Sequence, residues 1–97
     1  MKLLCLDIPS PTATLEQYGP HMLDEVRHGW DLYKSGFIRD IYFRQDRPGV
    51  AILAEADSVE AARATLMTFP LAQADLIGWD IIPLGPMVNW ELLFAKA

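Results

Sequence analysis

The stretch LIGWDIIPL, from Leu76 to Leu84, has the composition of a β-strand that a folded core buries. Alternation along a strand divides it into two faces, Gly78, Asp80, Ile82 and Leu84 on one and Ile77, Trp79 and Ile81 on the other. Asp80 therefore either pairs with a basic side chain of a neighbouring strand or subunit, or faces a pocket and takes part in chemistry. Asp7 presents the same alternatives in the first strand of the chain.

Strand and helix signals alternate along the rest of the sequence. Thr14 and Gln17 predict a helix cap, Pro20 predicts either a kink after one turn or the start of the helix, and Pro70 predicts a helix end. The cap of the second helix is Asp57 or Ser58. The predicted elements are a strand at residues 2–8, a helix that ends near Lys34, a hairpin at 37–46 and 50–56, a helix at 59–69 and the opening strand.

This β-α-β-β-α-β order predicts a ferredoxin-like α+β fold, with a four-stranded antiparallel sheet and two helices on one face. The other sheet face is left bare. The 97 residues make one domain, and 52% of them are apolar, which exceeds the roughly 45 to 50% of an average soluble domain. The surplus predicts a homo-oligomer, a dimer or larger, in which two bare sheet faces pack together.

The domain is predicted to cover residues 1–86, followed by a C-terminal tail at residues 87–97. Six large apolar side chains fall within eight residues of this tail, from Met87 to Phe94. Trp90, Leu93 and Phe94 have the spacing of one helical turn, so we expect the tail to dock on a neighbouring subunit or to cover the pocket.

Composition also argues against several classes of protein. The net charge is −5 and basic residues are isolated, which argues against a nucleic-acid partner. No apolar run approaches the roughly 18 residues of a membrane span, and the apolar start is too short for a signal peptide, so no membrane partner is expected. A single cysteine, Cys5, excludes an internal disulfide and predicts a buried thiol in a cytoplasmic protein.

Three segments, KSGFI, DSVEAARATL and FPLAQADLIGWDIIPL, resemble the muconolactone isomerase group of the dimeric α+β barrel superfamily. The likeness covers roughly residues 25–84. It implies a dimeric α+β barrel of two protomers, each with a cofactor-free pocket between sheet and helices. In that pocket, ionisable groups at the start of the first helix and on nearby strands move a proton on a small lactone. Glu25 matches the family's acidic helix residue, but Met22 occupies the position of its usual lysine. The family's acid/base pair is therefore not reproduced.

His21, Glu25 and His28 are spaced so that their side chains share one face of the first helix. They form an acid/base cluster, a metal site or a solvated face with ordinary charges. We take His28 or His21, helped by Glu25, as the predicted acid/base group, and expect no metal and no cofactor. The apolar stripe of this helix lies nearly opposite and consists of Met22, Val26, Trp30 and Tyr33.

The second predicted strand supplies groups that could orient a substrate. Alternation places Arg39 on the face of Phe37, Ile41 and Phe43, whereas Tyr42 and Arg44 lie on the other face. Tyr42 could donate a hydrogen bond to a carbonyl, and Arg39 or Arg44 could anchor a carboxylate. The alternative is that these charges keep an edge strand from pairing wrongly. Asp80 and Trp79 complete the predicted substrate-binding set.

The predicted function is that of a cofactor-independent isomerase or cyclase that transfers a proton on a small carbonyl compound or lactone. Two alternatives remain open at this stage. One is a non-catalytic module that binds a small ligand or serves assembly. The other is a small cofactor-free monooxygenase of the same superfamily, for which the tryptophans and the aromatic residues of the second strand would suit a flat substrate.

Overall fold

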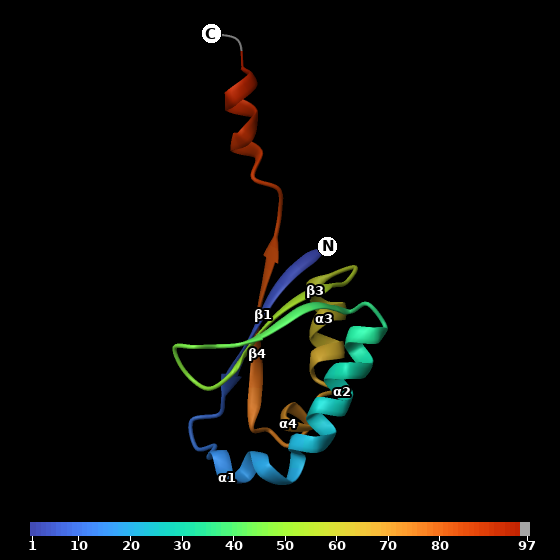
Figure 1. Cartoon of the computed structure of the whole chain (residues 1–97), viewed down its shortest axis with the longest axis vertical. Coiled ribbons are helices and arrows are strands. Elements are labelled where there is room, and N and C mark those ends of the chain that lie inside the picture. Colours follow the sequence, from blue (N-terminus) through green and yellow to red (C-terminus); the bar gives the residue numbers. More distant parts are fainter. Residues whose placement is uncertain (96–97) are drawn as a thin grey trace.

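The structure is a computed structural model that describes residues 1–95 of the chain. Four strands form one sheet in the order β2-β3-β1-β4, and every neighbouring pair is antiparallel. The strands are β1 (Lys2–Pro9), β2 (Ile38–Phe43), β3 (Val50–Glu55) and β4 (Ile77–Leu84). The helices lie along one face of this sheet (Figure 1). The predicted ferredoxin-like α+β fold is therefore confirmed.

The first helical segment has a kink, as Pro20 predicts. It consists of α1 (Leu15–Tyr18), the 3-10 turn η1 (Gly19–His21) and α2 (Met22–Lys34). At its start the backbone N–H of Thr14 donates to Oε1 of Gln17 over 2.8 Å, which confirms the predicted contact between the two residues. No helix among residues 1–95 is long and apolar enough to cross a membrane.

The segment after the second predicted helix differs from the prediction. The helix α3 (Val59–Leu66) is capped by Ser58, whose Oγ accepts from the backbone N–H of Ala61 over 3.0 Å. Pro70 does not end this helix but begins another, α4 (Pro70–Gln73). A proline fits there because the first residue of a helix has no intrahelical partner for its N–H. The sequence prediction had no helix at this place.

The core lies between the sheet and the helices, and strand alternation decides which residues enter it. Ile77, Trp79 and Ile81 of β4 are buried, whereas Asp80 and Ile82 are exposed on the opposite face. The predicted division of β4 is thus confirmed. The thiol of Cys5 is buried as predicted, and burial raises its pKa to about 11, so the thiol stays protonated at neutral pH.

The opposite sheet face carries apolar side chains that none of the helices within residues 1–95 covers (Figure 1). Paired positions in the three strand ladders place thirteen residues there, namely Lys2, Leu4, Leu6, Ile8, Asp40, Tyr42, Ala51, Leu53, Glu55, Gly78, Asp80, Ile82 and Leu84. Ile82 and Leu84 are 38% and 40% exposed. We call this surface the bare sheet face.

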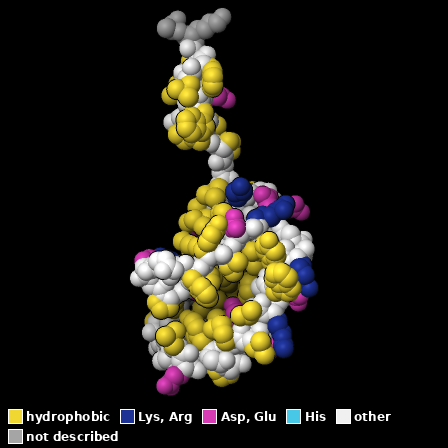
Figure 2. Space-filling model, viewed as in Figure 1, with side chains coloured by type: hydrophobic (Ala, Val, Ile, Leu, Met, Phe, Trp, Pro, Cys, Tyr) yellow, Lys and Arg dark blue, Asp and Glu magenta, His cyan; other side chains and the backbone are white. Residues whose placement is uncertain are grey.

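The C-terminal tail extends away from the body of the molecule (Figure 1). It contains the 3-10 helix η2 (Val88–Phe94), which confirms that the segment is helical. Trp90 and Phe94 are 63% and 84% exposed, and hydrophobic side chains cover much of the visible tail (Figure 2). Lys96 and Ala97 of the predicted tail lie outside the described residues. Docking of the tail on a second copy stays a prediction.

Candidate functional site

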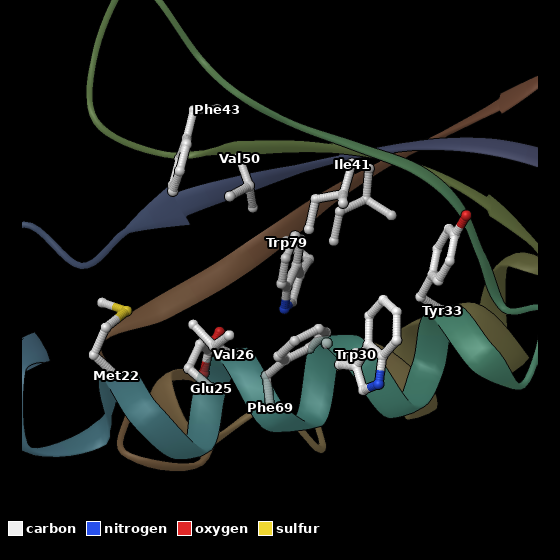
Figure 3. A pocket seen from close by; sticks show the side chains of 12 residues that line it. Met22, Glu25, Val26, Trp30, Tyr33, Ile41, Phe43, Val50, Phe69 and Trp79 are labelled. Atoms are coloured by element: carbon white, nitrogen blue, oxygen red, sulfur yellow. The ribbon is translucent and has the colours of Figure 1, made fainter.

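A cavity of about 560 Å³ opens between α2 and the sheet. Figure 2 shows a hollow in the body with hydrophobic side chains around it, and Figure 3 shows the residues that line the cavity. They are Met22, Glu25, Val26, Gly29, Trp30 and Tyr33 from α2, Ile41 and Phe43 from β2, Val50 and Ile52 from β3, Phe69, and Trp79 from β4. The walls are thus mostly apolar, which suits a small, largely apolar ligand.

Glu25 is the carboxylic acid among these lining residues. Its side chain is half-buried, and Oε1 accepts a hydrogen bond of 2.9 Å from the backbone N–H of Leu71, the second residue of α4. Burial raises the pKa of Glu25, and this effect outweighs the hydrogen bond from Leu71, which lowers it. A carboxyl group held in place beside an apolar cavity, with a raised pKa, can both accept and return a proton.

The two histidines lie beside the cavity but are not among the residues that line it. The Oγ1 of Thr68 donates to the carbonyl of Thr65 and therefore accepts from Nε2 of His28, 2.6 Å away. The His28 ring also meets Phe69 edge-on, with ring centroids 5.0 Å apart. These contacts attach His28 to the segment between α3 and α4, where Nε2 serves as a donor. His21 is the last residue of η1 and is half-buried.

One of the three alternatives for the histidine face of α2, a solvated face with ordinary charges, does not fit this arrangement. His21, Glu25 and His28 are half-buried, whereas Met22, Val26, Trp30 and Tyr33 of the apolar stripe are between 41% and 62% exposed. The face with the histidines is therefore not the solvated one. The reason is that the stripe borders the open cavity, while the other side of the helix packs on Phe69 and α4.

The remaining candidates are spread over the sheet. Tyr42 lies on the bare sheet face and borders a second hollow of about 180 Å³. The register of β2 shifts between Ile38 and Asp40, which is a bulge at Arg39. This bulge breaks the predicted alternation, so Arg39 is not paired on the face of Ile41. Asp80 lies on the bare sheet face and not at the cavity.

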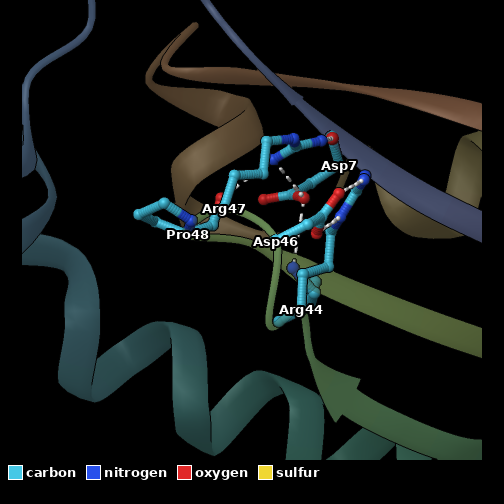
Figure 4. A network of polar contacts seen from close by, with 6 residues as sticks. Asp7, Arg44, Asp46, Arg47 and Pro48 are labelled. Carbon is cyan, nitrogen blue, oxygen red and sulfur yellow. Dashed lines mark hydrogen bonds and ion pairs between the residues drawn. The ribbon is translucent and has the colours of Figure 1, made fainter.

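Arg44 and Asp7 belong to a network around the loop between β2 and β3 (Figure 4). Arg44 forms a two-pronged pair with Asp46, at 2.9 and 2.6 Å, which lowers the pKa of Asp46 to about 2. Asp7 is buried, and its Oδ1 accepts from the backbone N–H of Val50 over 3.1 Å and lies 3.5 Å from Nη1 of Arg47. Nη2 of Arg47 donates to the carbonyl of Asp7 over 2.6 Å. These bonds fasten the loop to β1.

Gly49 is required where this loop meets β1. Its φ is +148°, a conformation that residues with a Cβ rarely adopt, and a Cβ there would come within 2.5 Å of Oδ1 of Asp7. Pairing with a basic side chain was one of the two alternatives predicted for Asp7, but its partner Arg47 was not identified from the sequence. The signal for it was the aspartate inside an apolar strand together with the RPG turn.

Of the residues predicted to form the site, the structure brings Glu25 and Trp79 together at the cavity. His21 and His28 flank it, Arg44 is engaged with Asp46, and Asp80 lies across the sheet. Sequence reasoning missed the part of Phe69, which joins the cavity wall to His28 and to Trp79. The FPL motif indicated a helix boundary and carried no signal for a cavity wall.

No protein family model matches the sequence, and no curated protein sequence matches it. Among solved structures, the chain is similar to 5-chloro-2-hydroxyhydroquinone dehydrochlorinase from Burkholderia phenoliruptrix AC1100 in complex with 2,5-dihydroxybenzoquinone. The TM-score is 0.72 and the identity 14%, over 92% of this chain and 98% of that one. It is also similar to muconolactone isomerase, with a TM-score of 0.69 and 19% identity, over 89% and 90% of the two chains. The predicted resemblance is thus confirmed at the level of the fold.

Proposed function

We propose that this protein is a cofactor-independent enzyme of the isomerase type, which moves a proton on a small carbonyl compound or lactone in the cavity beside α2. The observation that carries the proposal is Glu25, a half-buried carboxyl group in a mostly apolar lining, with its pKa raised by burial. The shared fold with muconolactone isomerase and with a dehydrochlorinase seen with a quinone ligand supports the same class of small substrate.

The proposed reaction needs one group that changes its protonation state twice. Ionised Glu25 removes a proton from the carbon next to the substrate carbonyl, and the electron pair moves onto the carbonyl oxygen. The neutral Glu25 then returns the proton to a different carbon, so that atoms and electrons balance without an added reactant. The hydrogen bond from Leu71 keeps one carboxyl oxygen in place during both steps.

The test uses muconolactone and 2,5-dihydroxybenzoquinone as probes, because they are named with the two similar structures. Each is incubated with the protein in deuterium oxide and followed by proton NMR, while tryptophan fluorescence reports binding. We expect at least one probe to bind and to exchange a carbon-bound proton for deuterium faster than in buffer. Binding without exchange would instead favour a ligand-binding module, and oxygen uptake with phenols would favour a monooxygenase.

We further propose that the protein works as a homo-oligomer whose bare sheet faces pack together. The support is the exposure of large apolar side chains there, including Ile8 at 50%. In this arrangement the predicted partner of Asp80 is a basic side chain of the second copy. The predicted cytoplasmic location also stays a prediction.

Replacement of Ile82 by Asp is expected to dissociate this oligomer, because an unpaired carboxylate at a buried interface costs several kcal/mol. Light scattering at micromolar concentration should show the mass falling to that of one chain. The matched control is Leu23→Asp, at a position on α2 that is 62% exposed and away from the bare sheet face. A native protein that is monomeric in this measurement would refute the proposed assembly.

A further inference from the structure

The indole of Trp79 carries a hydrogen-bond donor that lacks a partner. The side chain is 4% exposed, and Nε1 is a buried polar atom without a hydrogen bond to any of residues 1–95. Figure 3 shows the indole extending from β4 into the middle of the lining residues, with its nitrogen at the end nearest to α2. The donor is therefore aimed at the cavity.

An unpaired buried N–H is unfavourable, and native proteins rarely keep one without a reason. None of residues 1–95 accepts from this N–H, and the neighbouring Phe69 ring, with its centroid 5.7 Å away at an interplanar angle of 42°, has no oxygen or nitrogen to accept it. Buried tryptophans normally find a partner for Nε1–H. Because the cavity is lined mostly by apolar groups, the simplest partner for this N–H is an atom of a bound ligand.

We infer that Nε1–H of Trp79 donates a hydrogen bond to an acceptor oxygen of a flat, otherwise apolar ring compound bound in this cavity. The inference rests on the proposed function and deepens it, because it names the group that binds the substrate oxygen. Since Nε1 is buried in the free protein, the inference requires the side chains around the indole to shift as the ligand enters. The donor then stabilises the negative charge that develops on the oxygen when Glu25 removes the proton.

The substrate class follows from the indole donor of Trp79 and the carboxyl group of Glu25. A neutral donor suits a carbonyl oxygen of a lactone, ketone or quinone, whereas a carboxylate would call for a cationic partner. Arg44 is engaged with Asp46 and Arg47 with Asp7, outside the cavity lining. We therefore expect the preferred ligand to carry a ring carbonyl and no charge on the part that enters the cavity.

The test compares two probes of similar shape, 1-indanone and indane, in which a carbonyl group of the first takes the place of a CH2 group of the second. In the full-length protein labelled with ¹⁵N, the Nε1–H resonance of Trp79 should move downfield with 1-indanone and shift much less with indane. Trp79→Phe assigns the resonance by its loss. As a matched control, Trp90→Phe removes the resonance of the exposed tail tryptophan and should leave the response to 1-indanone unchanged.

Affinity gives the second readout. Trp79→Phe keeps an aromatic ring but lacks the donor. The variant should therefore bind 1-indanone with an affinity roughly 2- to 10-fold lower than that of the native protein, and its affinity for indane should be unchanged. Equal weakening of both probes, an unshifted Nε1–H resonance or no binding of 1-indanone would each overturn the inference. The Glu25→Gln variant should retain the shift of the Trp79 resonance. Loss of proton exchange in this variant, with the shift retained, therefore tests the role of Glu25 in the proposed reaction and leaves the role of Trp79 as donor unaffected.

Discussion

Replacing Glu25 by Gln should lower the rate of proton exchange on a bound probe by about 10²- to 10⁴-fold, the usual contribution of a positioned acid/base group. The amide of Gln can still accept the hydrogen bond from Leu71, so the cavity should keep its shape and its affinity for the probe. The loss should therefore appear in kcat, with KM little changed. Exchange rates from proton NMR and affinities from tryptophan fluorescence provide the two measurements.

The pH profile of kcat/KM of the native protein should show the titration of the Glu25 carboxyl group. Because Glu25 removes the proton in its ionised form, kcat/KM should rise with pH through its raised pKa and then level off. In Glu25→Gln this rise should disappear. Glu60→Gln, at an exposed position in the first turn of α3, makes the same chemical change away from the cavity and should keep the native profile.

Stability supplies a readout that needs no substrate. Burial raises the pKa of Glu25 in the folded protein above its ordinary value of 4.5, so the folded state binds the proton more tightly than the unfolded state. The free energy of unfolding should therefore fall as pH rises from about 4.5 through the raised pKa. Glu25→Gln should weaken this fall, as urea titrations at several pH values would show.

Two outcomes would contradict the role of Glu25. One is a Glu25→Gln variant with native exchange rates. The other is loss of exchange in a protein carrying both His21→Gln and His28→Gln while Glu25→Gln remains active. That second result would return the acid/base role to the histidines, although they flank the cavity and do not line it.

Strands in which apolar and polar residues alternate regularly could be predicted from the sequence. Alternation placed Trp79 and Asp80 on opposite faces of β4, because a strand has only two faces, and the structure buries Trp79 and exposes Asp80 on the bare sheet face. The order of strands and helices then restricted the topology to the ferredoxin-like fold. The bulge near Arg39 could not be predicted, because it inserts one residue into the alternation without a clear sequence signal.

The site needed information that the sequence pattern does not hold. A helical wheel gives the angles between Glu25, His28 and the apolar stripe, but it does not say which face meets the next element. That depended on α4, which was not predicted and whose backbone N–H at Leu71 holds Glu25 at the cavity. The unpaired Nε1 of Trp79 likewise follows from packing in three dimensions and not from local sequence.

Deletion of residues 87–97 should lower the mass of the assembled protein, its melting temperature or both. The physical reason is that Trp90, Leu93 and Phe94 are 63%, 71% and 84% exposed within one chain. Their burial against a second copy at about 1.5 to 3 kcal/mol each would contribute on the order of 5 kcal/mol, which is enough to decide assembly. Light scattering and thermal unfolding of the truncated and native chains provide the comparison.

A full-length control separates the length of the tail from its apolar character. In a variant with Trp90, Leu93 and Phe94 all replaced by Ser, the chain keeps its length and loses the proposed contacts, so it should behave like the deletion. Glu91→Gln changes a polar residue of the same helix and should leave the assembly intact. Native mass and melting temperature in both the deletion and the triple variant would show that the tail makes no contact of consequence.

The geometry of η2 also indicates what kind of surface would receive it. A 3-10 helix has about three residues per turn, so Trp90 and Leu93 share one edge, while Val88, Glu91 and Phe94 of η2 share another. Large apolar groups therefore project from more than one side of the tail, and a flat surface would cover only one of them. We expect the tail to lie in a groove between elements of a second copy, where Trp90 and Phe94 contact opposite walls. Single replacements of Trp90 and of Phe94 by Ser should then each weaken the assembly, whereas docking on a flat surface would make one of them neutral.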